Sequence, residues 1–385
     1  MFSYKKTLLT SIVVLLMALC FAYYKGVFGS HIFLRKTDFD ALPKWSADDQ
    51  TVAFHAFQKS CVVILQRPSP HAPYFRLTAS RDNATWQRIC LAANQLKKVN
   101  RETARQFFET WFTPYVVMDH GSTRGLFTGY YLPAIQGNSH PTKAAHQPIY
   151  AVPADLVKLN LGLFNKEWKD KTLVGQLKDH ILQPYPDRAA IQKGAIRSHA
   201  KIIAWVKDPV DLFFAEIQGS AILNLPYHQS ILISYASTNG QPYTAIGKIL
   251  IQRKEIEKSK MSMQAIREWL SAHPKEADDL LNQNASYVFF RVLKQKEPLG
   301  TEQVPLTPEG SLAVDKHFIP LGAPIWLETT LPDATDYHHL LVAQDTGGAI
   351  KGAVRGDIYW GEGEAAADKA GHMKQTGRYW LLLPR

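Results

Sequence analysis

Two apolar, strand-like runs near the C-terminus restrict the folds open to this chain, because each is joined to an aspartate. Asp345 follows the run 341–344, and Asp357 lies within the second run. A third aspartate, Asp315, follows another apolar run thirty residues before Asp345. Apolar runs separated by a Gly-Gly pair are typical of strands joined by tight turns. A barrel rim can direct such acids at a ligand while the core stays dry, so we expect functional carboxylates on a β-barrel.

The N-terminus has the pattern of an export signal or a membrane anchor. Lys5 and Lys6 precede an apolar run at 8–24, which is longer than most signal cores and shorter than many full spans. Cleavage and retention of the segment 1–30 therefore both stay open. The two lysines place the rest of the chain outside the cytoplasm, facing the periplasm of the cell envelope. The 385 residues suffice for two domains.

The three cysteines leave two questions open. Cys20 lies near the end of the apolar run, where acylation would make the protein a lipoprotein, but the preceding residues 17–19 fit lipoprotein processing poorly. Cys61 and Cys90 would lie in an oxidising compartment. A disulfide between them and two separate buried thiols both fit the sequence.

The chain has a formal net charge of +10, which favours attraction to polyanions. The export signal and the lack of a concentrated Lys/Arg tract disfavour nucleic acid, so we expect no nucleic-acid partner. Anionic lipid and a carboxylate-bearing cell-wall polymer both remain compatible with this charge.

The spacing of apolar residues predicts helices at 87–96 and 103–112, whose aromatic side chains we expect in the core. After residue 127 the pattern changes to short apolar runs between Pro, Gly and Asn, which predicts a β-rich region. Its expected strands include the runs 147–153, 202–206 and 212–223. Ser262 predicts the start of a helix at 262–270, and strands are expected again from residue 287.

The sequence favours carboxylate chemistry over the other common classes of catalysis. It has no HExxH, paired CxxC or GxxxxGKS motif, so we expect neither a metal nor another cofactor. The serine of Gly219-Ser220-Ala221 lacks the GxSxG frame of a serine hydrolase. Aromatic and amide side chains suit sugar rings and their N-acetyl groups. The candidate sugar-binding residues are Tyr130, Gln218, Ser220, Asn239 and Tyr243.

Several motifs of this chain resemble one known family over nearly all of 128–383. They are TGYY at 128–131, DPVDLFF at 208–214, QGS at 218–220, NGQPYTAIG at 239–247, NQNASYVFF at 282–290 and IPLG at 319–322. Together with the aspartate-bearing C-terminal runs they are similar to the membrane-bound lytic murein transglycosylase A family. The terminal region resembles its three-aspartate domain, whose acids fall on Asp315, Asp345 and Asp357.

The resemblance implies a mainly β fold with flanking helices. A six-stranded double-psi β-barrel would be built from 31–129 and 286–385, and a smaller β-rich domain, 130–285, would be inserted into it. A groove between the two domains would hold the substrate. Two departures from the family pattern, Ala221 and Ser237-Thr238, would reshape this groove without affecting the acids.

The resemblance also implies cleavage of the β-1,4 bond between N-acetylmuramic acid and N-acetylglucosamine in peptidoglycan strands, which leaves a 1,6-anhydro end. Asp357 matches the catalytic acid, Asp345 the neighbouring groove acid, and Asp315 is expected at the substrate. Because the attacking hydroxyl belongs to the substrate, one carboxyl group can act first as acid and then as base. A hydrolase using Asp357 and Asp345, and a non-catalytic wall-binding module, stay as alternatives. Expected partners are the membrane, through the N-terminal segment, and wall-remodelling proteins.

Overall fold

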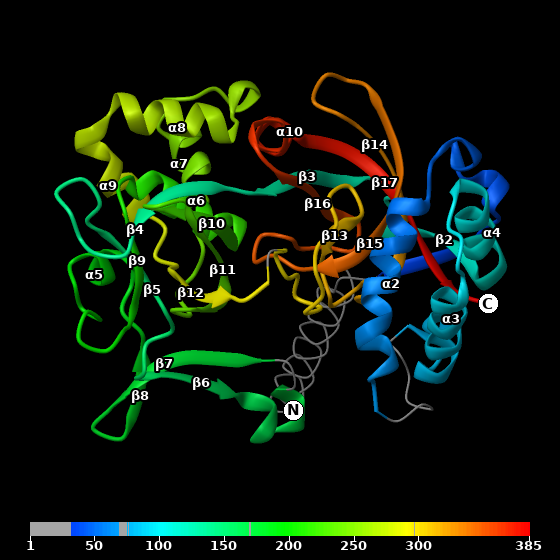
Figure 1. Ribbon diagram of the computed structural model, residues 1–385, viewed down its shortest axis with the longest axis horizontal. Coiled ribbons are helices and arrows are strands. Elements are labelled where there is room, and N and C mark those ends of the chain that lie inside the picture. Colours follow the sequence, from blue (N-terminus) through cyan, green and yellow to red (C-terminus); the bar gives the residue numbers. More distant parts are fainter. Residues whose placement is uncertain (1–31, 69–74, 76, 169–170, 296) are drawn as a thin grey trace, which may run out of the picture.

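The computed structural model describes residues 32–385 apart from 69–74, 76, 169–170 and 296 (Figure 1). The expected signal or anchor at 1–30, with Cys20, lies outside the described residues. None of the helices in the described part of the chain is both long and apolar enough to cross a membrane. The architecture is mixed α/β and rich in strands, with three separate sheets.

The largest sheet closes on itself. Its eight strands run in the order β1-β2-β17-β14-β15-β13-β16-β3, and β17 also pairs with β3. Strands β17, β14, β15, β13, β16 and β3 therefore form a closed circuit of hydrogen-bonded neighbours, in which the pairs β13–β15 and β16–β3 are parallel. The strands are β1 (Ile32–Lys36), β2 (Phe112–Asp119), β3 (Gly125–Leu132), β13 (Ser311–Val314), β14 (Pro324–Thr330), β15 (Asp336–Asp345), β16 (Arg355–Glu362) and β17 (Lys374–Pro384).

Strands of this circuit are buried along most of their length. All four residues of β13 and the first four of β14 are buried, which is typical of strands covered on both faces. Trp326 on β14 packs edge-on against Trp45, with ring centroids 5.0 Å apart. Helix α10 (Glu364–His372) lies over β3 and β16. Glycine is required at Gly129 of β3, since a Cβ there would lie 2.6 Å from a ring carbon of Trp360.

Three helices pack on this sheet and contain the expected aromatic core (Figure 1). They are α2 (Thr51–Leu65), α3 (Asn83–Gln95) and α4 (Arg101–Trp111), so both helices predicted in this region are confirmed. Asp82 caps α3 by accepting from the backbone of Thr85, and Asn100 forms a capping box with Thr103 at α4. The aromatic side chains packed here are Phe54, Phe57, Trp86, Phe107, Phe108 and Phe112.

Cys61 of α2 and Cys90 of α3 are joined by a disulfide, with their Cα atoms 5.2 Å apart. Of the two states that the sequence left open, the structure contains the bonded one. The bond closes a loop with a sequence separation of 29 residues that includes the segment between the two helices. It therefore restricts the unfolded chain where α2 and α3 must meet.

We expect the Cys61→Ala/Cys90→Ala double variant to lose about 2–4 kcal/mol of unfolding free energy, mainly because its unfolded state is less restricted. Urea unfolding followed by circular dichroism measures this loss. The matched control is the wild-type protein in reductant, which should unfold near the midpoint of the double variant. A wild-type midpoint that is insensitive to reductant, together with an unchanged variant midpoint, would contradict this stabilising role.

The second sheet has six strands in the order β12-β11-β10-β4-β9-β5. The chain enters it directly from the first sheet, because only Pro133 separates β3 from β4. The strands are β4 (Ala134–Asn138), β5 (Gln147–Tyr150), β9 (Ile202–Val206), β10 (Ser220–Leu225), β11 (Gln229–Thr238) and β12 (Val288–Leu293). The helices of this region are α5 (Arg188–Gln192), α6 (Pro209–Gln218), α7 (Ile246–Gln252), α8 (Met263–Ala272) and α9 (Pro274–Asn282).

The expectation of strand structure throughout 212–223 is wrong in its first half, which belongs to helix α6. The Asp208 side chain accepts from the backbone of Val210, and Pro209 occupies the first helical turn, where its missing N–H costs nothing. Gly219, with φ 79°, ends the helix in the left-handed conformation. The signals that start and end a helix thus determine the structure here, and the apolar run, which suggested a strand, does not. The predicted helix with Ser262 as its N-cap is confirmed as α8.

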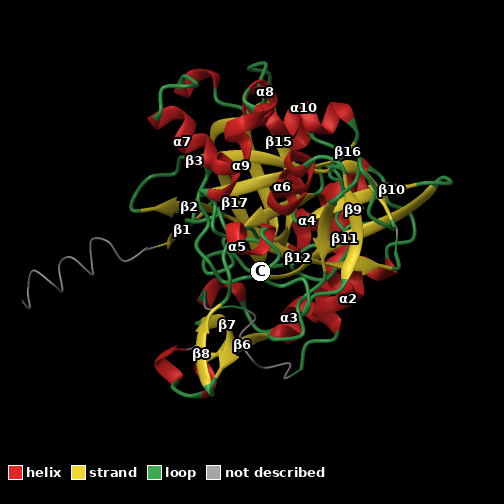
Figure 2. Cartoon of the chain, turned by 90° about the vertical axis from the view of Figure 1, so that its left-hand side faces the viewer, coloured by secondary structure: helices red, strands yellow, loops and turns green. Residues whose placement is uncertain are grey.

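A third sheet consists of β6 (Leu156–Asn160), β7 (Thr172–Lys178) and β8 (Ile181–Pro184) in that order. Two short 3₁₀ turns, Leu161–Leu163 and Lys166–Trp168, lie between β6 and β7. This small sheet projects from the body of the molecule, at the lower edge of Figures 1 and 2.

Candidate active site

Strand β13 brings Asp345 and Asp357 to the same place. Ala313 pairs with Asp345 on the parallel strand β15 and with Asp357 on the antiparallel strand β16. Residues paired across a sheet point to the same face, and two strand spacings amount to roughly 9–10 Å between the backbones. The carboxylate of Asp345 raises the pKa of Asp357, as expected for two acids on one face. The sheet order therefore creates an acid pair that the sequence separates by twelve residues.

Asp357 is a half-buried carboxyl group with a defined set of neighbours. Thr128, its pair on β3, donates its hydroxyl to Asp357 Oδ1 at 2.6 Å. Arg355 donates from Nη2 to the Thr128 hydroxyl at 2.8 Å. Burial raises the pKa of Asp357 above its ordinary value, against the opposing effects of Arg355 and Thr128, and Asp345 raises it further. A carboxyl group in this setting can carry a proton at a higher pH than an exposed one.

Asp345 accepts four hydrogen bonds. Thr301 donates to Oδ1 through its backbone N–H at 2.8 Å and its hydroxyl at 2.9 Å, and the Thr346 N–H donates to the same oxygen at 2.8 Å. Tyr130 donates its hydroxyl to Oδ2 at 3.0 Å. Burial raises the pKa of Asp345 above its ordinary value, although these four donors act in the opposite direction. The four donors hold the carboxyl group in one orientation, which fits a positioning role better than the activation of water.

Tyr130 links the acid pair to a hydrophobic floor. Its ring packs on Tyr359, with centroids 5.2 Å apart, and its hydroxyl points at Asp345. Burial, followed by the charge of Asp345, raises the pKa of Tyr130 well above its ordinary value, so the hydroxyl stays a donor. The same cluster includes Leu232 of the second sheet and Leu306. Both large sheets thus meet beside the two aspartates.

The structure gives Asp315 a different place from the one expected at the substrate. This side chain is only 5% exposed and accepts from the backbone N–H of Gly352 at 3.0 Å. It also accepts from the His317 N–H, and lies 2.7 Å from His317 Nδ1. Burial acts to raise the pKa of Asp315, but these donors outweigh it and the pKa is lowered. Asp315 thus fixes the loop that leads into β16.

Gln218 and Ser220 lie close to the site but are engaged by the protein. Gln218 Oε1 accepts from the backbone N–H of Tyr131, next to Tyr130 on β3, at 3.0 Å. Ser220 donates to the hydroxyl of Ser234 across the β10–β11 pair at 3.2 Å. Of these two side chains, Gln218 has an amide nitrogen that makes no hydrogen bond to a described residue, so this group can bind a ligand.

Asn239, expected to bind sugar, is fully buried and supports the backbone. Its Nδ2 donates to the carbonyls of Pro186 and Ala285, both at 2.9 Å, and its Oδ1 accepts from the Tyr287 N–H at 2.9 Å. The side chain therefore has no free polar group for a ligand. Tyr243, by contrast, is 46% exposed and remains available.

Sequence reasoning missed three residues of this site. Thr128 was noted only as part of the TGYY motif, and Arg355 and Thr301 were not singled out. Arg355 precedes Asp357 by two residues, so alternation along a strand places both on one face, a signal that was present. Thr301 lies in a loop, and nothing local in the sequence indicates its contact with Asp345.

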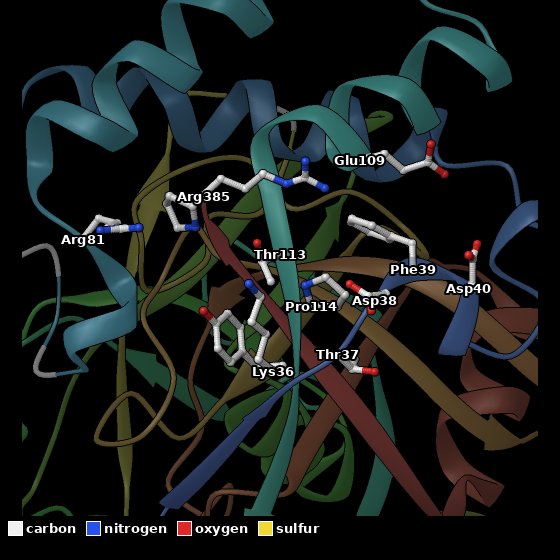
Figure 3. A pocket seen from close by; sticks show the side chains of 12 residues that line it. Lys36, Thr37, Asp38, Phe39, Asp40, Arg81, Glu109, Thr113, Pro114 and Arg385 are labelled. Atoms are coloured by element: carbon white, nitrogen blue, oxygen red, sulfur yellow. The ribbon is translucent and has the colours of Figure 1, made fainter.

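A polar cavity of about 640 Å³ lies elsewhere, beside β1, β2 and the C-terminus (Figure 3). Lys36, Arg81, Glu109 and Arg385 are among its lining residues, and none of the aspartates discussed above is. It is therefore distinct from the acid pair. Across the described ranges, no three His, Cys, Asp or Glu side chains come together in a group that could hold a metal ion.

Comparisons with known proteins agree with this geometry. Residues 126–291 match the family model described as the MltA specific insert domain, and residues 310–383 match the 3D domain. The membrane-bound lytic murein transglycosylase A of Escherichia coli K12 is 36% identical over 264 residues, which cover 66% of this chain. The chain spans 65% of the length of that relative.

Two solved structures extend the comparison. A crystal structure of MltA from Neisseria gonorrhoeae is 33% identical with a TM-score of 0.77, and the match covers 92% of this chain and 93% of that one. The structure of E. coli MltA with bound chitohexaose is 28% identical with a TM-score of 0.64, over 86% of this chain and 90% of that one.

Proposed function

Because this chain belongs to the membrane-bound lytic murein transglycosylase A family, we propose that it is a peptidoglycan lytic transglycosylase. It would cleave the β-1,4 bond between N-acetylmuramic acid and N-acetylglucosamine and leave a 1,6-anhydro end. The observation that carries the proposal is the placement of Asp345 and Asp357 on one face, with the pKa of Asp357 raised. The relative that binds chitohexaose supports a glycan strand as the ligand.

In the proposed mechanism Asp357 acts twice. The protonated carboxyl group first donates its proton to the glycosidic oxygen, and the bond from that oxygen to C1 of the muramic residue breaks. The carboxylate then accepts the proton of the muramic C6 hydroxyl as that oxygen bonds to C1. The nucleophile belongs to the substrate, so no water has to be positioned. One titrating carboxyl group is enough, and it regains its proton at the end of the cycle.

In this mechanism Asp345 is a positioning residue. Thr301, Thr346 and Tyr130 occupy its oxygens and favour its charged form. Its charge would help to keep the proton on Asp357, since two close carboxylates resist joint ionisation. Tyr130 would also form part of the sugar-binding floor, beside the amide of Gln218, whose Oε1 binds the neighbouring residue Tyr131. Exposed Tyr243 stays a proposed sugar-binding residue. Ser220 would shape the groove through its contact with the Ser234 hydroxyl, and Asn239 through its contacts with the backbone.

The finer description of the fold belongs to the same proposal. The closed circuit of six strands is taken as the double-psi β-barrel, formed from 31–129 and 286–385, with 130–285 inserted. One boundary is moved, because β12 at Val288–Leu293 pairs with β11 and so belongs to the insert. The glycan would lie between the two parts, above the cluster that contains Tyr130 and Leu232. The protein would act in the cell envelope, held at a membrane by its N-terminal segment.

Digestion of purified sacculi tests the proposed reaction. Mass spectrometry of the soluble products should find anhydromuropeptides, which are one water lighter than hydrolysed products. Reducing muramic ends would instead indicate the hydrolase that uses Asp357 and Asp345, because that product requires water at C1. Binding to sacculi without release of any product would indicate a non-catalytic wall-binding module.

Thr128→Val should shift the pH dependence of the reaction. The Thr128 hydroxyl lowers the pKa of Asp357, so its loss should raise that pKa. Activity requires protonated Asp357 in the first step, so the alkaline limb of the pH-rate profile should move to higher pH. We also expect roughly a tenfold lower rate from the lost hydrogen bond. The control is Thr128→Ser, which keeps the donor and should keep the profile. If the alkaline limb of the pH-rate profile lay at the same pH in Thr128→Val and Thr128→Ser, the assignment of Asp357 as the acid would be contradicted.

A further inference from the structure

The small third sheet has one face made of apolar side chains. Paired residues share a face, and the register pairs Leu159 with Leu173 and Leu177 with Leu182. Alternation along β6 and β7 adds further members to this face. Its residues are Val157, Leu159, Leu173, Gly175, Leu177, Leu182 and Pro184. We call this set the apolar face.

The opposite face of the small sheet contacts the body of the protein. A Cβ placed on Gly240 would lie 2.7 Å from Cβ of Val174, which alternates with the apolar face along β7. The apolar face therefore points away from the body. Leu173 is 49% exposed and Leu177 is 60% exposed, so large apolar side chains lie in contact with solvent. A contiguous exposed apolar surface of this kind marks an interaction site.

The turns between β6 and β7, at one end of the small sheet, also expose apolar side chains. Leu163 is 82% exposed, Phe164 67% and Trp168 42%. The exposed residues Lys166 and Lys171 lie within and beside these turns. We call Leu163, Phe164 and Trp168 the apolar tip. Aromatic and aliphatic side chains flanked by lysines are typical of segments that rest at the interface of a membrane with water.

We propose that the apolar face and the apolar tip rest on the surface of an anionic lipid bilayer. The flanking lysines and the net charge of +10 complement acidic headgroups. Only seven residues, 25–31, separate the apolar N-terminal run 8–24 from the first described residue, Ile32, which keeps a bilayer within reach. The sheet has open edges, so its backbone stays at headgroup depth while side chains enter the acyl region. This contact is additional to the N-terminal attachment and holds the body in one orientation.

Quenching of Trp168 by brominated lipid tests this contact in the full-length protein. The protein is reconstituted in vesicles of phosphatidylcholine and phosphatidylglycerol, with bromine on the acyl chains of the former. The chain contains nine tryptophans, so the emission of Trp168 is taken as the difference between wild type and Trp168→Phe. We expect bromine to lower this difference at least twofold. Vesicles of phosphatidylcholine alone should give several-fold less quenching.

The double variant Leu163→Glu/Phe164→Glu should abolish the quenching of Trp168, because charge at the tip opposes its insertion. The control is Tyr227→Glu, which changes a 93% exposed side chain in the turn between β10 and β11 and should leave the quenching unchanged. The proposal would be overturned if brominated lipid did not quench the emission of Trp168. It would also be overturned if the double variant were quenched as strongly as the wild type. If cross-linked dimers formed with the wild type and with Tyr227→Glu but not with the double variant, the surface would instead bind a second copy of this chain.

Discussion

Asp357→Asn should reduce the release of anhydromuropeptides from sacculi by at least about a hundredfold, which is the cost of losing a positioned general acid. The substitution keeps the shape of the side chain and can still accept from Thr128, so the fold should persist. It removes only the proton that both steps of the proposed mechanism require. Product release is measured by chromatography and mass spectrometry at several pH values, and the thermal midpoint is measured on the same samples.

Asp368→Asn is the matched control, because Asp368 is an exposed aspartate of helix α10 that forms an ion pair with His372. This variant should release products at the wild-type rate. Activity of Asp357→Asn above about a tenth of wild type would remove Asp357 from the role of acid. Loss of activity with an equal loss of thermal stability would point to a structural role for Asp357 instead.

The acid pair could be predicted from the sequence because its signal is local. Asp345 and Asp357 each belong to an apolar run that becomes a strand, and the family motif marks both. Their neighbours are harder to predict, since Thr128 contacts Asp357 from the neighbouring strand β3 and Thr301 contacts Asp345 from a loop, both from distant parts of the chain. These contacts depend on the strand order and on the path of that loop, and the sequence states neither.

The expected sugar-binding residues show the same limit. Asn239 precedes Gly240 in a turn, where an amide could equally bind a ligand or the backbone. The acceptors of its amide, Pro186 and Ala285, lie about fifty residues away on either side in sequence, so the local pattern cannot decide. Asp315 was likewise grouped with Asp345 and Asp357, but its partners are His317, two residues later, and Gly352, in the loop that leads into β16. A polar residue in a loop thus indicates a hydrogen-bonding site without indicating its partner.

Helix α6 was missed for a different reason. Its residues are mostly apolar and buried, so the periodicity that separates a helix from a strand is weak. The informative signals were the cap at Asp208, Pro209 after it and Gly219 at the end. Glu216 gave a further signal, since a charged residue within an apolar run requires a buried partner.

That partner is Arg188, and Arg188→Met should cost about 3–5 kcal/mol of unfolding free energy, because it leaves a buried carboxylate uncompensated. Arg188 donates from both Nη atoms to Glu216, at 3.1 and 2.6 Å, and from Nε to the carbonyl of Asn284 at 3.0 Å. Its guanidinium also lies over the rings of Phe213 and Tyr287. The pair joins α5, α6 and the chain that enters β12, so its loss should loosen the insert.

The pH dependence of Arg188→Met tests this cause. Burial raises the pKa of Glu216, and without Arg188 only the hydrogen bond from the Val288 N–H opposes that effect, so the folded variant should hold Glu216 protonated above its ordinary range. The loss of unfolding free energy relative to wild type should be small near pH 4 and grow as the pH rises toward 7. Over this range the unfolded variant releases the proton of Glu216, while the folded variant retains it. Glu216→Gln added to Arg188→Met removes the buried charge and should recover much of the loss at pH 7. Urea unfolding at both pH values measures all three proteins, and a loss independent of pH, with no recovery in the double variant, would assign the effect to packing of the arginine side chain.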